Sequence, residues 1–278
     1  MHTPTLTVFS KPWKFPLPEL AQHVSALGFD GIELPVRPGY PVTPDNVDVE
    51  LVRAVHIMGE HGLKIASIAG PTDEKTLAAC ADAGIPLIRI CVGMRAGEGY
   101  MEGERRLQAE FDRLTPLLDR YRVTLGIQNH CGDRDVCNAM GLRHLIERFD
   151  PRHIAAVWDA GHNGLEGEAP EPALDIVWSH LAMVNLKSAY WRRKEGATDA
   201  AQAWEAYWTT GKDGRANWPR VVAELQRRRY GGVVCLTAEY TDEEAVDRLV
   251  AEDLAFARSL FAVDSNGGFP PEGQIKNS

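Results

Sequence analysis

The sequence lacks any apolar run approaching the roughly 18 residues needed to cross a membrane. Its first residues also lack the apolar core of a secretory signal, so we expect a cytoplasmic protein with no membrane partner. Basic residues are in deficit, with 30 Lys and Arg against 39 Asp and Glu. The resulting net charge of -9 gives no field that attracts a phosphate backbone, and we expect no nucleic-acid partner.

Cysteine-pairing motifs and phosphate-binding loops are absent as well. The five cysteines are an odd number without a C-x-x-C pair, which favours reduced thiols over a disulfide framework or a structural zinc site. No glycine-rich turn follows the first expected strand, and the glycines between positions 93 and 99 lack the spacing of a phosphate-binding loop. We therefore expect no nucleotide cofactor.

What the 278 residues do contain is an ordinary globular composition, 44% hydrophobic and 25% charged, and a regular order of segments. Short apolar runs alternate with longer segments of helical periodicity, which predicts parallel strands joined by helices in a (β/α)8 TIM barrel. The expected strands are residues 6–10, 31–35, 64–69, 87–92, 123–129, 154–159, 183–187 and 232–240. The expected helices are residues 18–27, 47–61, 74–83, 102–120, 137–149, 171–180, 218–229 and 243–261.

We expect a single domain, with one barrel over residues 1–263. Residues 188–217 interrupt the alternation and are rich in tryptophan, arginine and lysine, so they form an insertion that serves as a lid or a partner surface. A homodimer is consistent with this aromatic insertion. Residues 264–278 show no periodicity and are expected to be a flexible tail.

The chemistry of such a barrel lies at the carboxyl ends of its strands, because the loops that follow the strands converge there. The polar residues that end the expected strands are therefore the candidate list. They are Glu33, Arg89, Gln128, Asn129, His130, Asp159, His162, Asn185, Lys187, Glu239 and Tyr240.

Several of these residues lie in short segments that resemble those of a known family. The segments 28–34 (GFDGIEL), 126–130 (GIQNH), 158–162 (WDAGH), 184–187 (VNLK) and 239–240 (EY), taken in order, resemble the xylose isomerase-like TIM-barrel superfamily. That group contains sugar phosphate isomerases and epimerases, inosose dehydratases and an endonuclease branch. The resemblance implies the same barrel and a sugar isomerase or epimerase activity, whereas the endonuclease branch is disfavoured by the absence of a basic face.

The resemblance also implies a metal site, held in those enzymes by Glu, Asp, His and Glu on strands five to eight. Asp159 and Glu239 match this pattern, but Gln128 and Asn185 stand in place of the other Glu and the His. Oxygen donors of reduced charge favour Mg²⁺ or Ca²⁺ over Zn²⁺ or Mn²⁺ and bind any of them more weakly. We expect a divalent metal, Mg²⁺ or else Mn²⁺, to be weakly bound or absent, with Lys187 as an alternative source of positive charge.

The predicted catalytic residues are Glu239 or Glu33 as the base, His162 or else His130 as an acid, and Lys187 as an electrostatic group. Loss of the strand-five carboxylate leaves one base. Three other interpretations stay open. In the first, Asp159 has only the structural role of capping a turn. In the second, Glu33 only forms an ion pair with Arg37 or Arg89. In the third, Lys187 acts as a nucleophile that forms a Schiff base.

Substrate binding is assigned to the remaining candidates. Amide side chains bind sugar hydroxyls or a neighbouring ligand, and aromatic rings stack on a sugar or fill the core. The predicted substrate-binding residues are His130, Gln128, Asn185, Trp191, Tyr240 and Arg89. His130 is also open to a purely structural role, and the cysteines are expected to be inert.

The sequence therefore predicts an isomerase or epimerase that removes a proton next to the carbonyl of a small polyhydroxylated substrate such as a sugar or cyclitol. Two alternatives remain. One is a lyase or dehydratase acting on a keto-sugar or cyclitol, and the other is a non-catalytic sugar-binding barrel.

Overall fold

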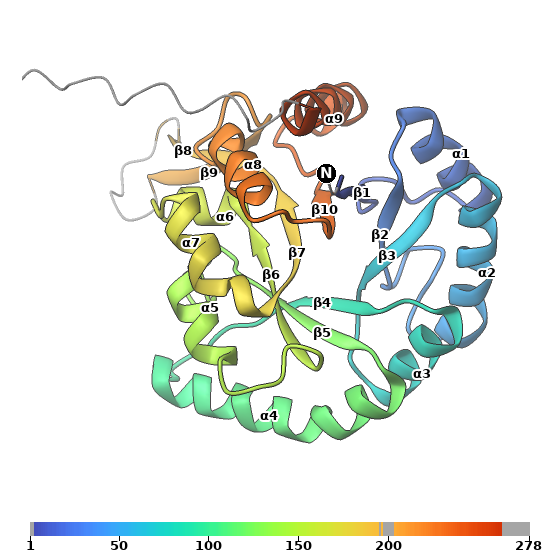
Figure 1. The fold of residues 1–278 in the computed structure, drawn as a ribbon, viewed down its shortest axis with the longest axis horizontal. Helices are drawn as coiled ribbons and strands as arrows, with labels where there is room; N and C mark the ends of the chain where they lie inside the picture. The colour runs from blue at the N-terminus through green and yellow to red at the C-terminus, as the bar shows by residue number, and fades with distance from the viewer. Residues whose placement is uncertain (1–2, 195, 197–202, 263–278) are drawn as a thin grey trace, which may run out of the picture.

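The computed structural model describes residues 3–194, 196 and 203–262, so the expected flexible tail lies outside the described residues. Eight parallel strands close into a barrel in the order β1-β10-β7-β6-β5-β4-β3-β2, with helices around the outside (Figure 1). The strands are β1 (Thr5–Phe9), β2 (Gly31–Pro35), β3 (Lys64–Ala69), β4 (Leu87–Cys91), β5 (Thr124–Gln128), β6 (Ile154–Asp159), β7 (Leu181–Leu186) and β10 (Val233–Leu236). The predicted (β/α)8 barrel is confirmed.

The helices follow the expected order along the chain. They are α1 (Leu17–Leu27), α2 (Val47–Glu60), α3 (Glu74–Ala83), α4 (Tyr100–Tyr121), α5 (Ala139–Ile146), α6 (Ala160–Leu165), α7 (Pro170–Val177), α8 (Trp218–Arg227) and α9 (Val246–Ala262), with short 3-10 turns η1 (Trp178–His180) and η3 (Glu243–Ala245). Side chains cap four of them by accepting a hydrogen bond from the backbone N–H three residues later. These caps are Asp73, Asn138, Asp159 and Asn217.

The barrel interior is filled below the site by apolar side chains from several strands, including Phe9, Leu87, Val157 and Met183. A second, larger apolar layer lies between the strands and the outer helices. Because side chains alternate along a strand, the interior position two residues after Val157 is Asp159. The apolar layer therefore supports polar side chains at the carboxyl ends of the strands.

The insertion after β7 contains an antiparallel hairpin, β8 (Ser188–Arg193) with β9 (Trp204–Thr209), which pairs from Ser188 with Thr209 to Arg193 with Trp204. The sequence predicted the insertion but not its strands, and it did not predict α6. Helix α6 lies against β8. In the part of the chain that the structure describes, no helix is both long and apolar enough to cross a membrane.

Candidate active site

A cavity of about 880 Å³ opens at the carboxyl ends of the barrel strands, next to the β8–β9 hairpin. Five predicted residues line it, namely His130, Lys187, Trp191, Glu239 and Tyr240. Lys11 and Trp208 also line it but are not among the predicted site residues. Lys11 follows the first strand by two residues, so the rule of polar residues after strand ends would have found it. The ring of Trp208 is placed by the hairpin, which the sequence did not predict.

Lys187 lies between a carboxylate and an aromatic ring. Its ammonium donates a hydrogen bond to Glu239 Oε2 at 2.7 Å and lies 3.6 Å from the centre of the Trp208 ring. Only 7% of Lys187 is exposed. The other Glu239 oxygen accepts a hydrogen bond from Lys11. Burial favours the neutral carboxyl of Glu239, but the positive charge of Lys187, reinforced by Lys11, lowers its pKa to about 2.

Glu33 and Arg89 form a buried ion pair below this cavity and do not line it. Arg89 Nε is 2.8 and 2.9 Å from the two Glu33 oxygens, and Nη2 is 2.7 Å from Oε2. Arg89 Nη1 also donates to Gln128 Oε1. Burial alone would lower the pKa of Arg89, but the Glu33 charge raises it above its ordinary value. The pairing of Glu33 with Arg89 that the sequence left open is therefore present.

Asp159 belongs to the same buried network. Its Oδ2 accepts a hydrogen bond from Gln128 Nε2 at 2.8 Å, and its Oδ1 accepts one from the His162 backbone N–H at 3.0 Å. Asp159 thus caps α6, which is the structural role that the sequence left open. Burial raises the pKa of Asp159, while the positive charge of Lys187 opposes this shift.

His162 is buried next to Asp159 and does not line the cavity. Its Nδ1 accepts a hydrogen bond from the Cys131 backbone N–H, and its Nε2 lies 4.0 Å from Asp159 Oδ2 without a hydrogen-bond partner in the described chain. Burial, and secondarily the charge of Lys187, lowers the pKa of His162 well below its usual value. The ring is therefore neutral at pH 7.

Asn185 is fully buried between Asp159 of β6 and Cys235 of β10 in the sheet register. Neither its Nδ2 nor its Oδ1 has a hydrogen-bond partner among the described residues. A buried amide without partners costs free energy, whereas Gln128 uses both of its amide atoms. Asn185 thus keeps unused hydrogen-bonding capacity, but it is buried and does not line the cavity.

The four predicted metal ligands do not fit a divalent cation as a set, because of the four only the Asn185 side chain lacks a partner among the described residues. Gln128 Oε1 is committed to Arg89, both Asp159 oxygens accept hydrogen bonds from protein groups, and both Glu239 oxygens face ammonium groups. Ammonium and guanidinium groups repel a metal ion at the positions where it would bind. Within residues 3–194, 196 and 203–262, no three His, Cys, Asp or Glu side chains are placed to hold a metal.

The two predicted aromatic residues are held in place by polar contacts. Trp191 Nε1 donates to the Leu165 carbonyl at 3.1 Å, and the Tyr240 hydroxyl donates to Asp253 Oδ2 at 2.8 Å. Both leave a ring surface on the cavity wall.

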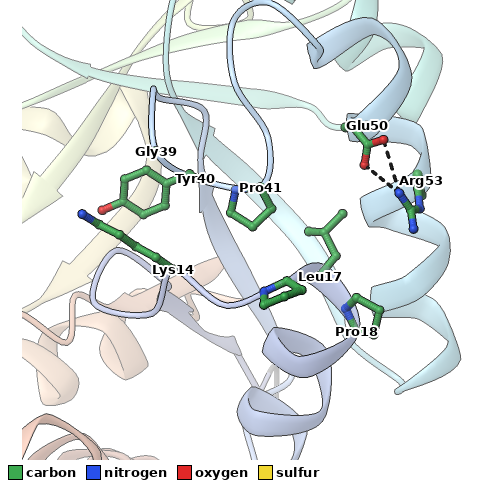
Figure 2. Close-up of a pocket in the computed structure, with 9 residues that line it drawn as sticks. Lys14, Leu17, Pro18, Gly39, Tyr40, Pro41, Glu50 and Arg53 are labelled. Atoms are coloured by element: carbon green, nitrogen blue, oxygen red, sulfur yellow. Dashed lines mark hydrogen bonds and ion pairs between the residues drawn. The ribbon is translucent and has the colours of Figure 1, made fainter.

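A second hollow of about 370 Å³ lies beside the main cavity, between α1, α2 and the loop that contains Gly39. Figure 2 shows Lys14 and Tyr40, which also line the main cavity, at one end of this hollow and the Glu50–Arg53 ion pair at the other. The sequence predicted no functional residue here.

A closed (β/α)8 barrel with a polar cavity at the carboxyl ends of its strands defines the class of TIM-barrel proteins. Residues 21–260 match the family model described as "Xylose isomerase-like TIM barrel". The chain belongs to this family, which confirms the resemblance seen in the sequence. A comparison with curated proteins finds no matching sequence.

Solved structures with the same fold include L-ribulose 3-epimerase, with a TM-score of 0.71 and 15% identity over 93% of this chain and 95% of the other. The probable 3-DHS dehydratase of Bacillus anthracis matches with a TM-score of 0.70 and 14% identity over 91% of this chain and 98% of the other. D-psicose 3-epimerase from Clostridium cellulolyticum H10, solved with D-tagatose, matches with a TM-score of 0.69 and 14% identity over 92% of this chain and 99% of the other. At such low identity, these similarities show the fold alone.

Proposed function

We propose that this protein is a sugar isomerase-like enzyme that moves a proton on the carbon next to a carbonyl group of a small polyhydroxylated substrate. The observation that carries the proposal is the position of Lys187, a nearly buried ammonium group on the wall of the cavity at the active end of the barrel. Membership of the xylose isomerase-like family supports the same class of substrate.

Lys187 supplies the positive charge that the reaction needs. Removal of a proton next to a carbonyl leaves negative charge on the carbonyl oxygen, and a fixed cation in a desolvated site stabilises that charge. The Lys187 ammonium is already fixed by Glu239 and the Trp208 ring. The proposed step therefore runs through protein side chains, and no part of it requires a divalent cation.

Glu239 is the hydrogen-bond partner of Lys187 instead of acting as the base. A carboxylate with a pKa of about 2 is a weak proton acceptor at neutral pH. Its contacts with Lys187 and Lys11 also disfavour the Schiff-base role for Lys187, since a protonated amine is not a nucleophile.

The binding roles belong to the wall of the cavity. We assign stacking on the substrate to Trp191 and Tyr240, which both line it. Below the cavity lies a buried network that does not line it, where mutual hydrogen bonds fix the strand ends. Its members are Arg89, Glu33, Gln128, Asp159 and His162.

A lyase or dehydratase reaction is the second candidate. One base and one fixed cation also suffice for elimination, because the same enolate expels a hydroxyl group from the neighbouring carbon. Product analysis separates the two, since elimination yields an unsaturated product and one molecule of water, whereas isomerisation leaves the formula unchanged. A non-catalytic sugar-binding barrel would bind a substrate without any exchange of its carbon-bound hydrogens.

The test is solvent-hydrogen exchange. The protein is incubated in D₂O with D-fructose, D-psicose, D-tagatose and L-ribulose, and deuterium on carbon is followed by NMR and mass spectrometry. We expect exchange with the wild type and a loss of about 10²-fold or more in Lys187→Met. The matched control is Lys212→Met, which removes a lysine that lies 5.2 Å from the Phe256 ring and outside the main cavity. Undiminished exchange in Lys187→Met would refute the proposed role of this cation.

A further inference from the structure

His130 and Asp135 form a contact at the cavity that the roles above do not use. His130 follows β5 and lines the cavity, with 39% of its side chain exposed. Its Nδ1 lies 2.7 Å from Asp135 Oδ2. Its Nε2 makes no hydrogen bond to any described residue. A carboxylate on one imidazole nitrogen with the other nitrogen free is the arrangement of an oriented general base.

The loop after β5 is built to bring Asp135 to His130. The Asp135 N–H donates to the Gly132 carbonyl at 3.0 Å, and the His130 N–H donates to the Val136 carbonyl at 3.0 Å. A Cβ atom on Gly132 would lie only 2.3 Å from Asp135 Oδ2. Glycine at position 132 therefore leaves the space that the carboxylate occupies. The sequence candidates omitted Asp135 because it lies in a loop, seven residues after the end of β5.

The other titratable groups near the cavity are poorly suited to remove a proton from carbon. Glu33 is buried in its ion pair, and Glu239 lies between two ammonium groups. Burial raises the pKa of the Cys131 thiol to about 11. Glu243 is exposed at the rim, and its side chain makes no hydrogen bond or ion pair with the described residues.

His130 lies on the same wall as the proposed cation. Its ring centre is 4.2 Å from that of His162, which is 4.9 Å from that of Trp208, which in turn contacts Lys187. His162 is neutral and tightly held, so it fixes this spacing without competing for the proton.

We propose that His130, oriented by Asp135, is the catalytic base of this cavity, a conclusion that rests on the proposed function. His130 Nε2 takes the proton from the carbon next to the carbonyl. The C–H electron pair becomes part of a carbon–carbon double bond, and the carbonyl electron pair moves to the oxygen that faces Lys187. In isomerisation, His130 returns the proton to the former carbonyl carbon. The hydroxyl group on the carbon that lost its hydrogen then becomes the new carbonyl, and its proton passes to the former carbonyl oxygen.

Asp135 is a positioning residue in this scheme. It touches His130 and not the substrate, and it stabilises the imidazolium formed when the proton is taken. Its removal should therefore lower kcat while leaving KM unchanged, because substrate binding does not involve it. The Ala side chain of Gly132→Ala would displace the carboxylate and should have the same effect on kcat.

The test is the D₂O exchange assay with the four ketoses, applied to His130→Ala, Asp135→Asn and Gly132→Ala. We expect His130→Ala to lose about 10²-fold or more of the exchange rate and to regain part of it when imidazole is added to the buffer. The matched control is His144→Ala, which removes a histidine that contacts Glu104 at the same 2.7 Å distance but does not line the cavity. His144→Ala should exchange at the wild-type rate.

The outcomes distinguish a failure of the proposed roles of His130 and Asp135 from a failure of the proposed function on which these roles rest. If the wild type exchanges hydrogen and His130→Ala does so at the same rate, His130 is not the catalytic base, and the proposed function still stands. A higher KM with unchanged kcat in Asp135→Asn would likewise overturn the positioning role. No exchange of any of the four ketoses by the wild type would overturn both proposals.

Discussion

At the scale of single residues, the charges around Glu239 define what its carboxylate contributes. The folded-state pKa of about 2 lies below the ordinary value of a glutamate, so the ionised form is favoured by folding. This stabilisation is present above about pH 4.5 and is lost as the pH falls towards 2. Lys187 and Lys11 thus tie the stability of the cavity to the ionisation of one residue.

Glu239→Gln tests this coupling. With one quarter of the Glu239 side chain exposed, its ionisation stabilises the fold by on the order of 2 to 3 kcal/mol at pH 7. Urea unfolding should therefore show a clear difference between wild type and Glu239→Gln at pH 7, and a smaller difference at pH 3. Equal differences at the two pH values would contradict the ion-pair account. Glu147→Gln, on the exposed face of the barrel, provides the control.

The same variant has a predicted effect on turnover. Without Glu239, Lys187 loses its carboxylate partner and no longer has a fixed position in the cavity. We expect Glu239→Gln to lower the rate of ketose exchange by about 10- to 100-fold, with little change in the far-UV circular dichroism spectrum at pH 7. Retention of most of the exchange rate would remove Glu239 from the mechanism.

At the scale of elements, the β8–β9 hairpin provides the aromatic wall of the cavity. Trp208 faces the cavity and Lys187, whereas Trp204 at the other end of β9 is largely exposed and does not line it. We expect Trp208→Ala to raise KM about 10-fold through loss of ring contacts, with Trp204→Ala as the matched control. Equal KM values for the two variants in the exchange assay would show that the hairpin takes no part in binding.

Helix α9 is joined to the cavity wall by Asp253. This buried carboxylate accepts hydrogen bonds from the Tyr240 hydroxyl and the Gly211 N–H. Burial raises its pKa to about 6, so the neutral form is favoured by folding and the stabilising effect is lost as the pH rises from about 4 through 6.

Asp253→Asn should remove this dependence on pH. The variant keeps a neutral side chain at every pH, so its stability relative to wild type should improve between pH 5 and pH 8. Thermal unfolding midpoints of both proteins across this range provide the measurement. A constant difference between the two midpoints would contradict the raised pKa of Asp253.

The sequence predicted the barrel strands well because each is a short apolar run bounded by turn residues. It missed β8 and β9, since their exposed faces carry arginine and tyrosine and show no buried alternation. It also placed Glu33 and Arg89 among residues facing the substrate. The direction in which a strand-end side chain points depends on its partners across the barrel, and Glu33 and Arg89 lie 56 positions apart in the chain.

At the scale of the whole molecule, the chain combines the barrel of its family with a site in which side-chain cations occupy the centre. The chain as a whole is acidic, with a net charge of -9, yet Lys11, Lys14 and Lys187 all line the cavity. With Glu239 and Glu243 as the lining carboxylates, this leaves a local excess of positive charge that opposes divalent cations. The family fold is thus retained, while Gln128 and Asn185 stand where the resemblance implies a Glu and a His.

Metal content tests this central claim most directly. The protein is purified without chelator, analysed by inductively coupled plasma mass spectrometry, and then assayed for ketose exchange with and without EDTA. The account predicts substoichiometric Mg, Mn, Ca and Zn, and the same exchange rate in the presence of EDTA. A stoichiometric divalent metal whose removal abolishes exchange would contradict it.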